Sequence, residues 1–189
     1  QLASGGMVLI KEQTASSSAS ISFVDGSSDV VLDSTYPIYL FKYIGIHPAN
    51  DDANFMFQGN ASGGSGYNET ITSTSFRSYH NESDSDNSLS YGTGSDQAQG
   101  TSFQRLMPFM DNDNDSNGNG ELFLFNPSST TFVKHFISTA QGVYSSDYSW
   151  NMFVAGYFNT TSAIDEIQFK MSSGNIDSGT IKLYGIKDS

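Results

Sequence analysis

Apolar and polar residues alternate along the C-terminal part of the chain. Between Ile164 and Met171, Ile167 and Phe169 fall on one side of an extended chain, and Glu166 falls on the other. This period of two is typical of a strand with one buried face. A Ser-Ser-Gly-Asn turn follows, and Thr180 to Ile186 has the pattern of a second strand. We therefore expect the two runs to form a hairpin-like unit that lies on a larger sheet.

Several other runs are apolar on both faces, and the strongest is Tyr36 to Ile46. The same holds for three further runs: Asn54 to Phe57, Leu122 to Phe125 and Trp150 to Phe158. An antiparallel strand with one wet face should alternate apolar and polar residues, so loops or a second subunit must cover the extra face. The pattern predicts an interface between identical subunits at five aromatic side chains: Tyr39, Phe41, Tyr43, Phe123 and Phe125.

Polar turn segments separate these runs. Thr70 to His80 alternates enough to be another strand, and Asn81 to Gly100 is expected to form a long exposed loop. Phe103 to Met110 suits an edge strand or a covering segment. The chain has no amphipathic helix of useful length. The prediction is an all-β fold, namely a single jelly-roll-like antiparallel β-sandwich with long polar loops. Residues 1–12 are expected to form a short N-terminal arm and residues 13–189 the domain.

Composition and charge exclude several functions. The chain has 189 residues, which suits one domain, and its net charge of −12 would repel phosphate backbones, so nucleic-acid binding is not expected. No apolar run approaches the roughly 20 residues of a membrane span, so we expect no membrane insertion. Cysteine is absent, which excludes disulfides and cysteine metal sites.

Three segments carry a resemblance to a known family. They are Ile164 to Ile186, Tyr39 to Phe57 and Glu121 to Pro127. Taken in their order along the chain, they resemble a β-sandwich domain that recurs in bacteriophage tail-fibre and virion structural proteins. The resemblance implies a place on the surface of a virion and contacts with other virion proteins. It also implies identical partner subunits, with a homotrimer preferred.

An acidic run indicates a candidate calcium site. Oxygen-bearing side chains recur at alternate positions, and a glycine follows them, as at the start of a calcium-binding loop. The candidate ligands are Asp111, Asp113, Asp115, Asn117, Asn119 and Glu121. The expected carboxylate at position 12 is replaced by Leu124, so the run is not an EF-hand. The alternative is an acidic turn between strands whose charges are solvated.

Aromatic residues next to polar ones indicate a candidate carbohydrate site. Tyr144, Tyr148 and Trp150 have the composition of a surface on which sugar rings stack. The alternative is packing in the core or at an interface, because the strand that Trp150 opens is apolar on both faces.

No catalytic constellation is visible in the sequence. The Gly-x-Ser-x-Gly motif of one hydrolase class is absent, and the three histidines do not have the spacing of metal ligands. We therefore expect a protein that is not an enzyme. Together with the resemblance, the sequence predicts a bacteriophage virion structural protein, such as a head decoration, a fibre or a tail appendage, that acts by subunit assembly. The alternative is a receptor- or carbohydrate-binding adhesin module.

Overall fold

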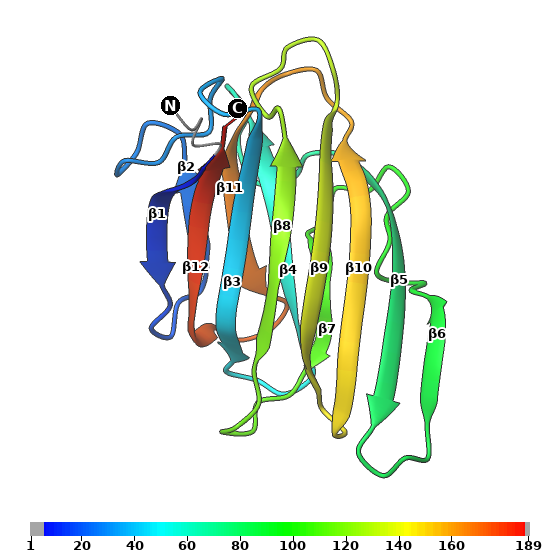
Figure 1. Ribbon diagram of the computed structural model, residues 1–189. Coiled ribbons are helices and arrows are strands. Elements are labelled where there is room, and N and C mark those ends of the chain that lie inside the picture. The colour runs from blue at the N-terminus through cyan, green and yellow to red at the C-terminus, as the bar shows by residue number, and fades with distance from the viewer. Residues whose placement is uncertain (1–5, 188–189) are drawn as a thin grey trace.

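The computed structural model describes residues 6–187, and these residues form strands and turns without a helix (Figure 1). The strands are β1 (Met7–Thr14), β2 (Ile21–Val24), β3 (Ile38–Pro48), β4 (Ala53–Ala61), β5 (Ile71–Asn81), β6 (Asn87–Tyr91), β7 (Gln104–Met110), β8 (Gly118–Phe125), β9 (Lys134–Tyr144), β10 (Tyr148–Phe158), β11 (Ile164–Met171) and β12 (Ile176–Ile186). All paired strands are antiparallel. The all-β prediction is confirmed.

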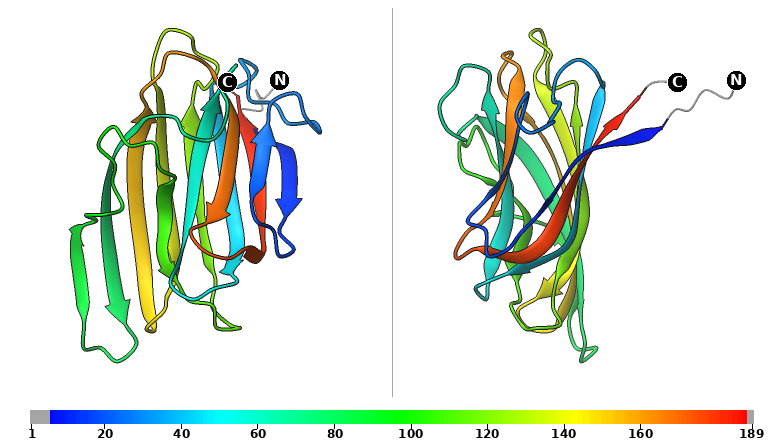
Figure 2. Two further views of the ribbon diagram at one scale, coloured as in Figure 1. Left: turned by 180° about the vertical axis from the view of Figure 1, so that it is seen from behind. Right: turned by 90° about the vertical axis from the view of Figure 1, so that its left-hand side faces the viewer.

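The strands form one sheet that folds back on itself. A long layer has the order β1-β12-β3-β8-β9-β10-β5-β6. A short layer, β7-β4-β11-β2, is joined to it by a single residue pair, Met110 with Tyr144. The short layer lies behind the long one in Figure 1 and in front of it in the left panel of Figure 2. The sheet nearly closes at its other end. There the side-chain amide of Gln13 in β1 donates a hydrogen bond to the backbone carbonyl of Ser22 in β2 at 2.8 Å.

Aromatic side chains fill the space between the two layers. Phe55 and Phe169 of the short layer stack with ring centres 5.7 Å apart, and Phe23 meets Phe41 of the long layer edge-on at 5.3 Å. All four side chains are fully buried. Each contributes roughly 1.5–3 kcal/mol through removal of apolar surface from water. This core fixes which face of the long layer points outward.

The predicted hairpin between the last two strands is wrong. β11 lies between β2 and β4 in the short layer, whereas β12 lies between β1 and β3 in the long layer. The turn at residues 172–175 therefore carries the chain from one layer to the other. Alternation correctly identifies a half-buried strand, but it contains no information about which strand lies beside it.

The predicted interface is wrong for three of its five residues. Tyr39, Phe41 and Tyr43 are fully buried inside the chain, so they cannot lie between folded copies. Both faces of β3 are apolar, and the pattern alone could not decide which face points inward. Phe123 and Phe125 are partly exposed on the opposite face of the same layer.

Two predicted segments have more structure than expected. The loop predicted at residues 81–100 contains β6, and its end is fastened by the buried Gln104, whose side-chain amide donates to the Ser95 carbonyl at 2.6 Å. The predicted N-terminal arm lies outside the described residues at positions 1–5, and residues 7–12 belong to β1.

Candidate functional site

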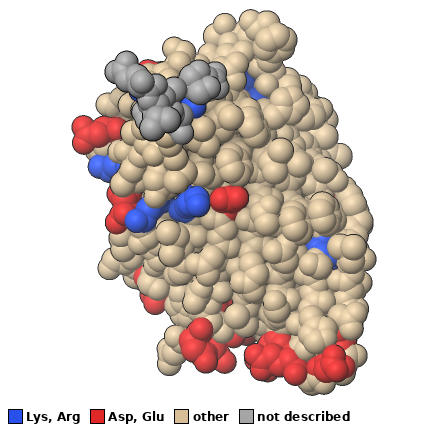
Figure 3. All heavy atoms as spheres, in the orientation of Figure 1, with Lys and Arg blue, Asp and Glu red and all other residues tan. Residues whose placement is uncertain are grey.

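The side of the long layer that faces away from the core is here named the outer face. Side chains alternate between the two sides of each strand, so its members are read from every second position. Among its apolar members are Ile38, Leu40, Ile44, Phe76, Leu89, Tyr91, Phe123, Phe125, Ile137, Phe153 and Tyr157. Figure 3 looks onto this face and shows it mostly uncharged, with acidic side chains gathered along its lower rim.

The upper half of the outer face is apolar. Ile137 lies opposite Phe123 on one side and opposite Ala155 on the other. One row lower, Phe153 lies opposite Thr139 and stacks on Phe76 with ring centres 4.6 Å apart. The small side chain of Ala155 leaves a depression of about 500 Å³, here named the apolar groove. Its walls are Thr72, Thr74, His135, Ile137 and Tyr157.

A short line of charged side chains crosses the outer face below this half (Figure 3). The Lys182 ammonium lies 2.8 Å from the Glu12 carboxylate, and the Lys42 ammonium lies 3.9 Å from Glu121. The hydrogen bond from Lys182 to Glu12 raises the pKa of Lys182. Exposed ion pairs contribute little to folding. Their effect here is to balance the charge, because two positive groups meet two negative ones.

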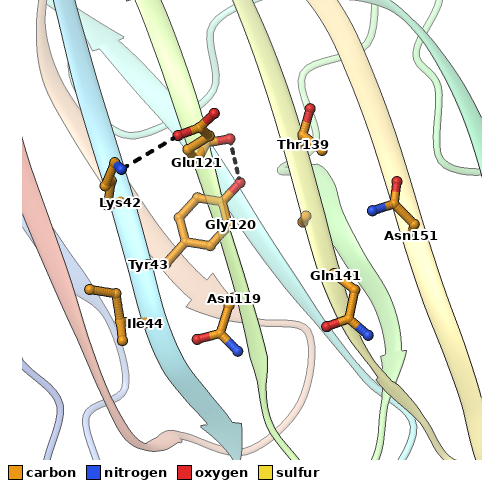
Figure 4. A pocket seen from close by; sticks show the side chains of 10 residues that line it. Lys42, Tyr43, Ile44, Asn119, Gly120, Glu121, Thr139, Gln141 and Asn151 are labelled. Atoms are coloured by element: carbon orange, nitrogen blue, oxygen red, sulfur yellow. Dashed lines mark hydrogen bonds and ion pairs between the residues drawn. The ribbon is translucent and has the colours of Figure 1, made fainter.

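A second depression lies on the lower half of the outer face and is lined by more polar side chains than the apolar groove (Figure 4). This polar groove has a volume of about 410 Å³, and three amide side chains, Asn119, Gln141 and Asn151, line it together with Lys42 and Glu121. The buried side-chain oxygen of Asn151 meets no hydrogen-bond donor in the described part of the chain. The polar groove therefore offers several hydrogen-bonding groups to a ligand.

Tyr43 supports the polar groove from inside. Its hydroxyl donates to the Glu121 carbonyl at 2.9 Å and also contacts the Ser138 hydroxyl. Because the phenol is fully buried, desolvation of the charged form raises its pKa. Tyr43 therefore stays neutral and ties β3 to β8 and β9.

The aromatic residues predicted to bind carbohydrate do lie together, but the ring faces of Trp150 are covered. Trp150 stacks against Tyr79 at 4.9 Å and against Tyr144 at 5.0 Å, and it is only 9% exposed. The Arg77 guanidinium lies 4.7 Å from the centre of its ring, and Tyr148 packs edge-on against both tyrosines. A sugar ring needs an open aromatic face, which Trp150 does not offer. This arrangement favours the packing alternative.

The acidic run forms a turn in which Asp111 is hydrogen-bonded within the run. Asp111 accepts hydrogen bonds from the Ser116 hydroxyl at 2.6 Å and from the Asp113 amide at 3.1 Å. Glu121 instead belongs to β8, where it faces Lys42. In residues 6–187, no three His, Cys, Asp or Glu side chains lie close enough together to hold a metal ion. Calcium binding at this run stays a prediction.

Sequence reasoning missed both grooves and the partners of Trp150. The grooves depend on which strands are neighbours: the polar groove combines residues from β3, β8, β9 and β10, and the apolar groove combines β5, β9 and β10. Tyr79 reaches Trp150 only because β5 pairs with β10 in one particular register. No local pattern in the sequence reports such a register.

Comparison of the chain with protein-family models, with curated proteins and with solved structures finds no match. The resemblance to bacteriophage proteins therefore stays a prediction. Within residues 6–187, the structure holds no helix of the length and apolar character that crossing a membrane requires.

Proposed function

We propose that this chain is a bacteriophage virion structural protein that assembles with copies of itself through the outer face. The observation that carries the proposal is the mostly uncharged outer face of a chain whose net charge is −12. Copies with this charge repel one another wherever their acidic surfaces meet. An apolar face with balanced ion pairs is the surface through which they approach at the smallest electrostatic cost.

The strand order supports a jelly-roll-like sandwich as the finer description of the fold. Eight of the strands form two rows, β1-β12-β3-β8 and β2-β11-β4-β7. Renumbered along the chain, these rows read 1-8-3-6 and 2-7-4-5, the order of an eight-stranded jelly roll. The remaining pairs, β9 with β10 and β5 with β6, extend the first row. Viral capsid domains commonly use this architecture, which agrees with the proposed virion role.

The proposed partners are identical subunits, with a homotrimer as the preferred state, and other virion proteins. The trimer is an analogy with three-fold virion fibres and spikes. The proposed location is the surface of the virion, as a head decoration, a fibre or a tail appendage. The chain is proposed to act through binding alone and not as an enzyme.

The mass of the purified protein in solution tests the assembly. Ile137 lies in the middle of the outer face and is half exposed, so Ile137→Asp should leave the fold intact. We expect the wild-type chain to form an oligomer, and we expect the variant to raise the dissociation constant at least about tenfold. Phe132→Asp is the control, because Phe132 is an exposed aromatic side chain in the loop between β8 and β9. A wild-type chain that is monomeric at every concentration contradicts the proposal.

The second candidate function is a carbohydrate-binding adhesin, and the polar groove is the observation that favours it. Amide side chains that line a depression can hydrogen-bond sugar hydroxyls, and Asn119, Gln141 and Asn151 all line the polar groove. If the chain binds glycans there, Asn151→Ala should abolish the signal on a glycan array. Trp150→Ala should weaken stability without removing the signal selectively. Retained binding in Asn151→Ala would contradict this candidate.

A further inference from the structure

The paired ends of β1 and β12 project from the molecule on the side of the outer face (Figure 2, right panel). Met7 pairs with Ile186 and Leu9 pairs with Tyr184, and this pair of ends is here named the ribbon. Met7, Val8 and Leu9 are 50%, 41% and 50% exposed. Consecutive residues point to opposite sides of a strand, so the ribbon presents apolar side chains on both sides. A two-stranded ribbon without a cover is only marginally stable in water.

The apolar groove lies at the same end of the long layer as the ribbon. Its wall residues Thr72, His135 and Tyr157 are each the second residue from an end of their strand, and the ribbon contains the first residues of β1 and the last of β12. Two strands, β3 and β8, separate β12 from β9. The ribbon of one molecule therefore cannot reach its own groove.

We propose that the ribbon of one copy packs Met7 and Leu9 into the apolar groove of a neighbouring copy, above Ala155. This inference rests on the proposed self-assembly and adds the residues that make the contact. Both surfaces are uncharged, so two acidic chains can meet there without burying unpaired charges. The ribbon and the groove are different surfaces on one molecule, so the contact is head-to-tail and can close into a ring.

Disulfide trapping between two chains tests the contact directly. The chain contains no cysteine, so any disulfide must join introduced residues. Leu9→Cys is placed in one preparation and Ala155→Cys in another, and the two are mixed under mild oxidation. We expect a disulfide-linked pair that contains one chain of each kind, because a disulfide requires the two Cα atoms to approach within about 7 Å. Either preparation alone should give no disulfide-linked dimer.

Association of single variants provides the second measurement. Leu9→Ser should raise the dissociation constant of the oligomer at least about tenfold. The control is Leu89→Ser, because Leu89 is 73% exposed but lies in β6 at the far edge of the long layer. Circular dichroism should show that both variants keep the wild-type fold.

The outcomes separate this inference from the proposed function. An oligomer that survives Leu9→Ser unchanged and yields no mixed disulfide overturns the ribbon contact and leaves assembly through the outer face standing. A wild-type chain that never associates overturns both, and the partner of the outer face is then a different molecule. A mixed disulfide together with weaker association of Leu9→Ser supports the ribbon contact.

Discussion

Tyr43 shows how one side chain links the interior to the outer face. Its ring packs against Phe55 in the core, with ring centres 5.3 Å apart, while its hydroxyl reaches the backbone of β8 beneath the polar groove. A buried hydroxyl must keep a hydrogen-bond partner, because an unpaired one costs about 1–3 kcal/mol. The polar groove therefore depends on a residue that is itself inaccessible to solvent.

The buried tyrosines predict a loss of stability in alkali. Burial raises the pKa of Tyr43 and, together with the nearby Asp33 carboxylate, that of Tyr39. Above pH 10 the unfolded chain releases these protons while the folded chain retains them, so the folded state binds more protons and stability falls as pH rises. The expected slope is up to about 1.4 kcal/mol per pH unit for each group. Urea unfolding between pH 9 and pH 11.5 measures it.

Tyr43→Phe should change this profile in two ways. At neutral pH the variant should lose about 1 kcal/mol, because the hydrogen bond to the Glu121 carbonyl is absent. Above pH 10 its free energy of unfolding should fall less steeply than that of the wild type. An unchanged slope would show that Tyr43 ionises normally in the folded state.

At the scale of single residues, the sequence predicted which aromatic residues cluster, but it did not predict which other side chains their rings contact. Tyr144, Tyr148 and Trp150 do meet, because the first and the last two lie on either side of a short turn between paired strands. The stacking of Tyr79 on Trp150 comes from a strand about 70 positions earlier, so local spacing could not predict that the indole is covered.

Strand pairing explains where glycine is needed in the sheet. In β8, a Cβ atom on Gly120 would lie 2.5 Å from the Thr139 carbonyl oxygen and 2.5 Å from the Tyr43 ring. The next strand contains Gly142, where an added Cβ would meet its nearest atom at 3.4 Å. The two glycines thus differ in the space around them, although both lie in neighbouring strands of one layer.

This difference predicts a large loss of stability for one of two matched substitutions and a small change for the other. Gly120→Ala should destabilise the fold by about 1–3 kcal/mol, because the backbone of β9 would have to move away from β8. Gly142→Ala should change stability by less than about 1 kcal/mol. Chemical denaturation of the two variants and the wild type measures the effect. Equal losses in both would contradict close packing of β8 against Tyr43.

At the scale of elements, alternation located the strands better than it paired them. The runs around Phe169, Phe123 and Trp150 are all strands. However, a run with two apolar faces, such as that around Phe41, does not reveal which face joins the core, and the turn after Met171 does not reveal that it crosses between layers. Both facts depend on contacts between distant parts of the chain.

As a whole molecule, a single copy is already compact. Its accessible surface is 8824 Å², close to the value of about 8,800 Å² expected for a folded monomer of 20.5 kDa. The core lies inside one chain and does not need a second one. Assembly through the outer face would therefore add to a domain that folds by itself.

This compactness predicts that folding and assembly can be separated. A monomeric Ile137→Asp variant should unfold cooperatively, with a midpoint that does not depend on protein concentration, whereas the wild-type midpoint should rise with concentration. Thermal unfolding at several concentrations measures both. If the monomeric variant lacked a cooperative transition, folding would require the oligomer.

The sequence predicted the function of the molecule less well than its fold. Charge and composition predicted no nucleic-acid partner, and the acidic run around Asp111 suggested a metal. The outer face proposed here for binding is instead made from residues such as Lys42, Phe123, Ile137 and Phe153 that come from different strands. Their common face exists only after the sheet has formed. A linear pattern cannot show a surface that is assembled across strands.

The position of β12 has a consequence for how the protein is made. It lies between β1 and β3, so β1 has no neighbour in its layer until residues near Ile186 have left the ribosome. β1 must therefore wait for β12, and the long layer can be completed only after β12 has been translated. A nascent chain that stalls before β12 would leave the edge of β3 open to pairing with other unfinished chains.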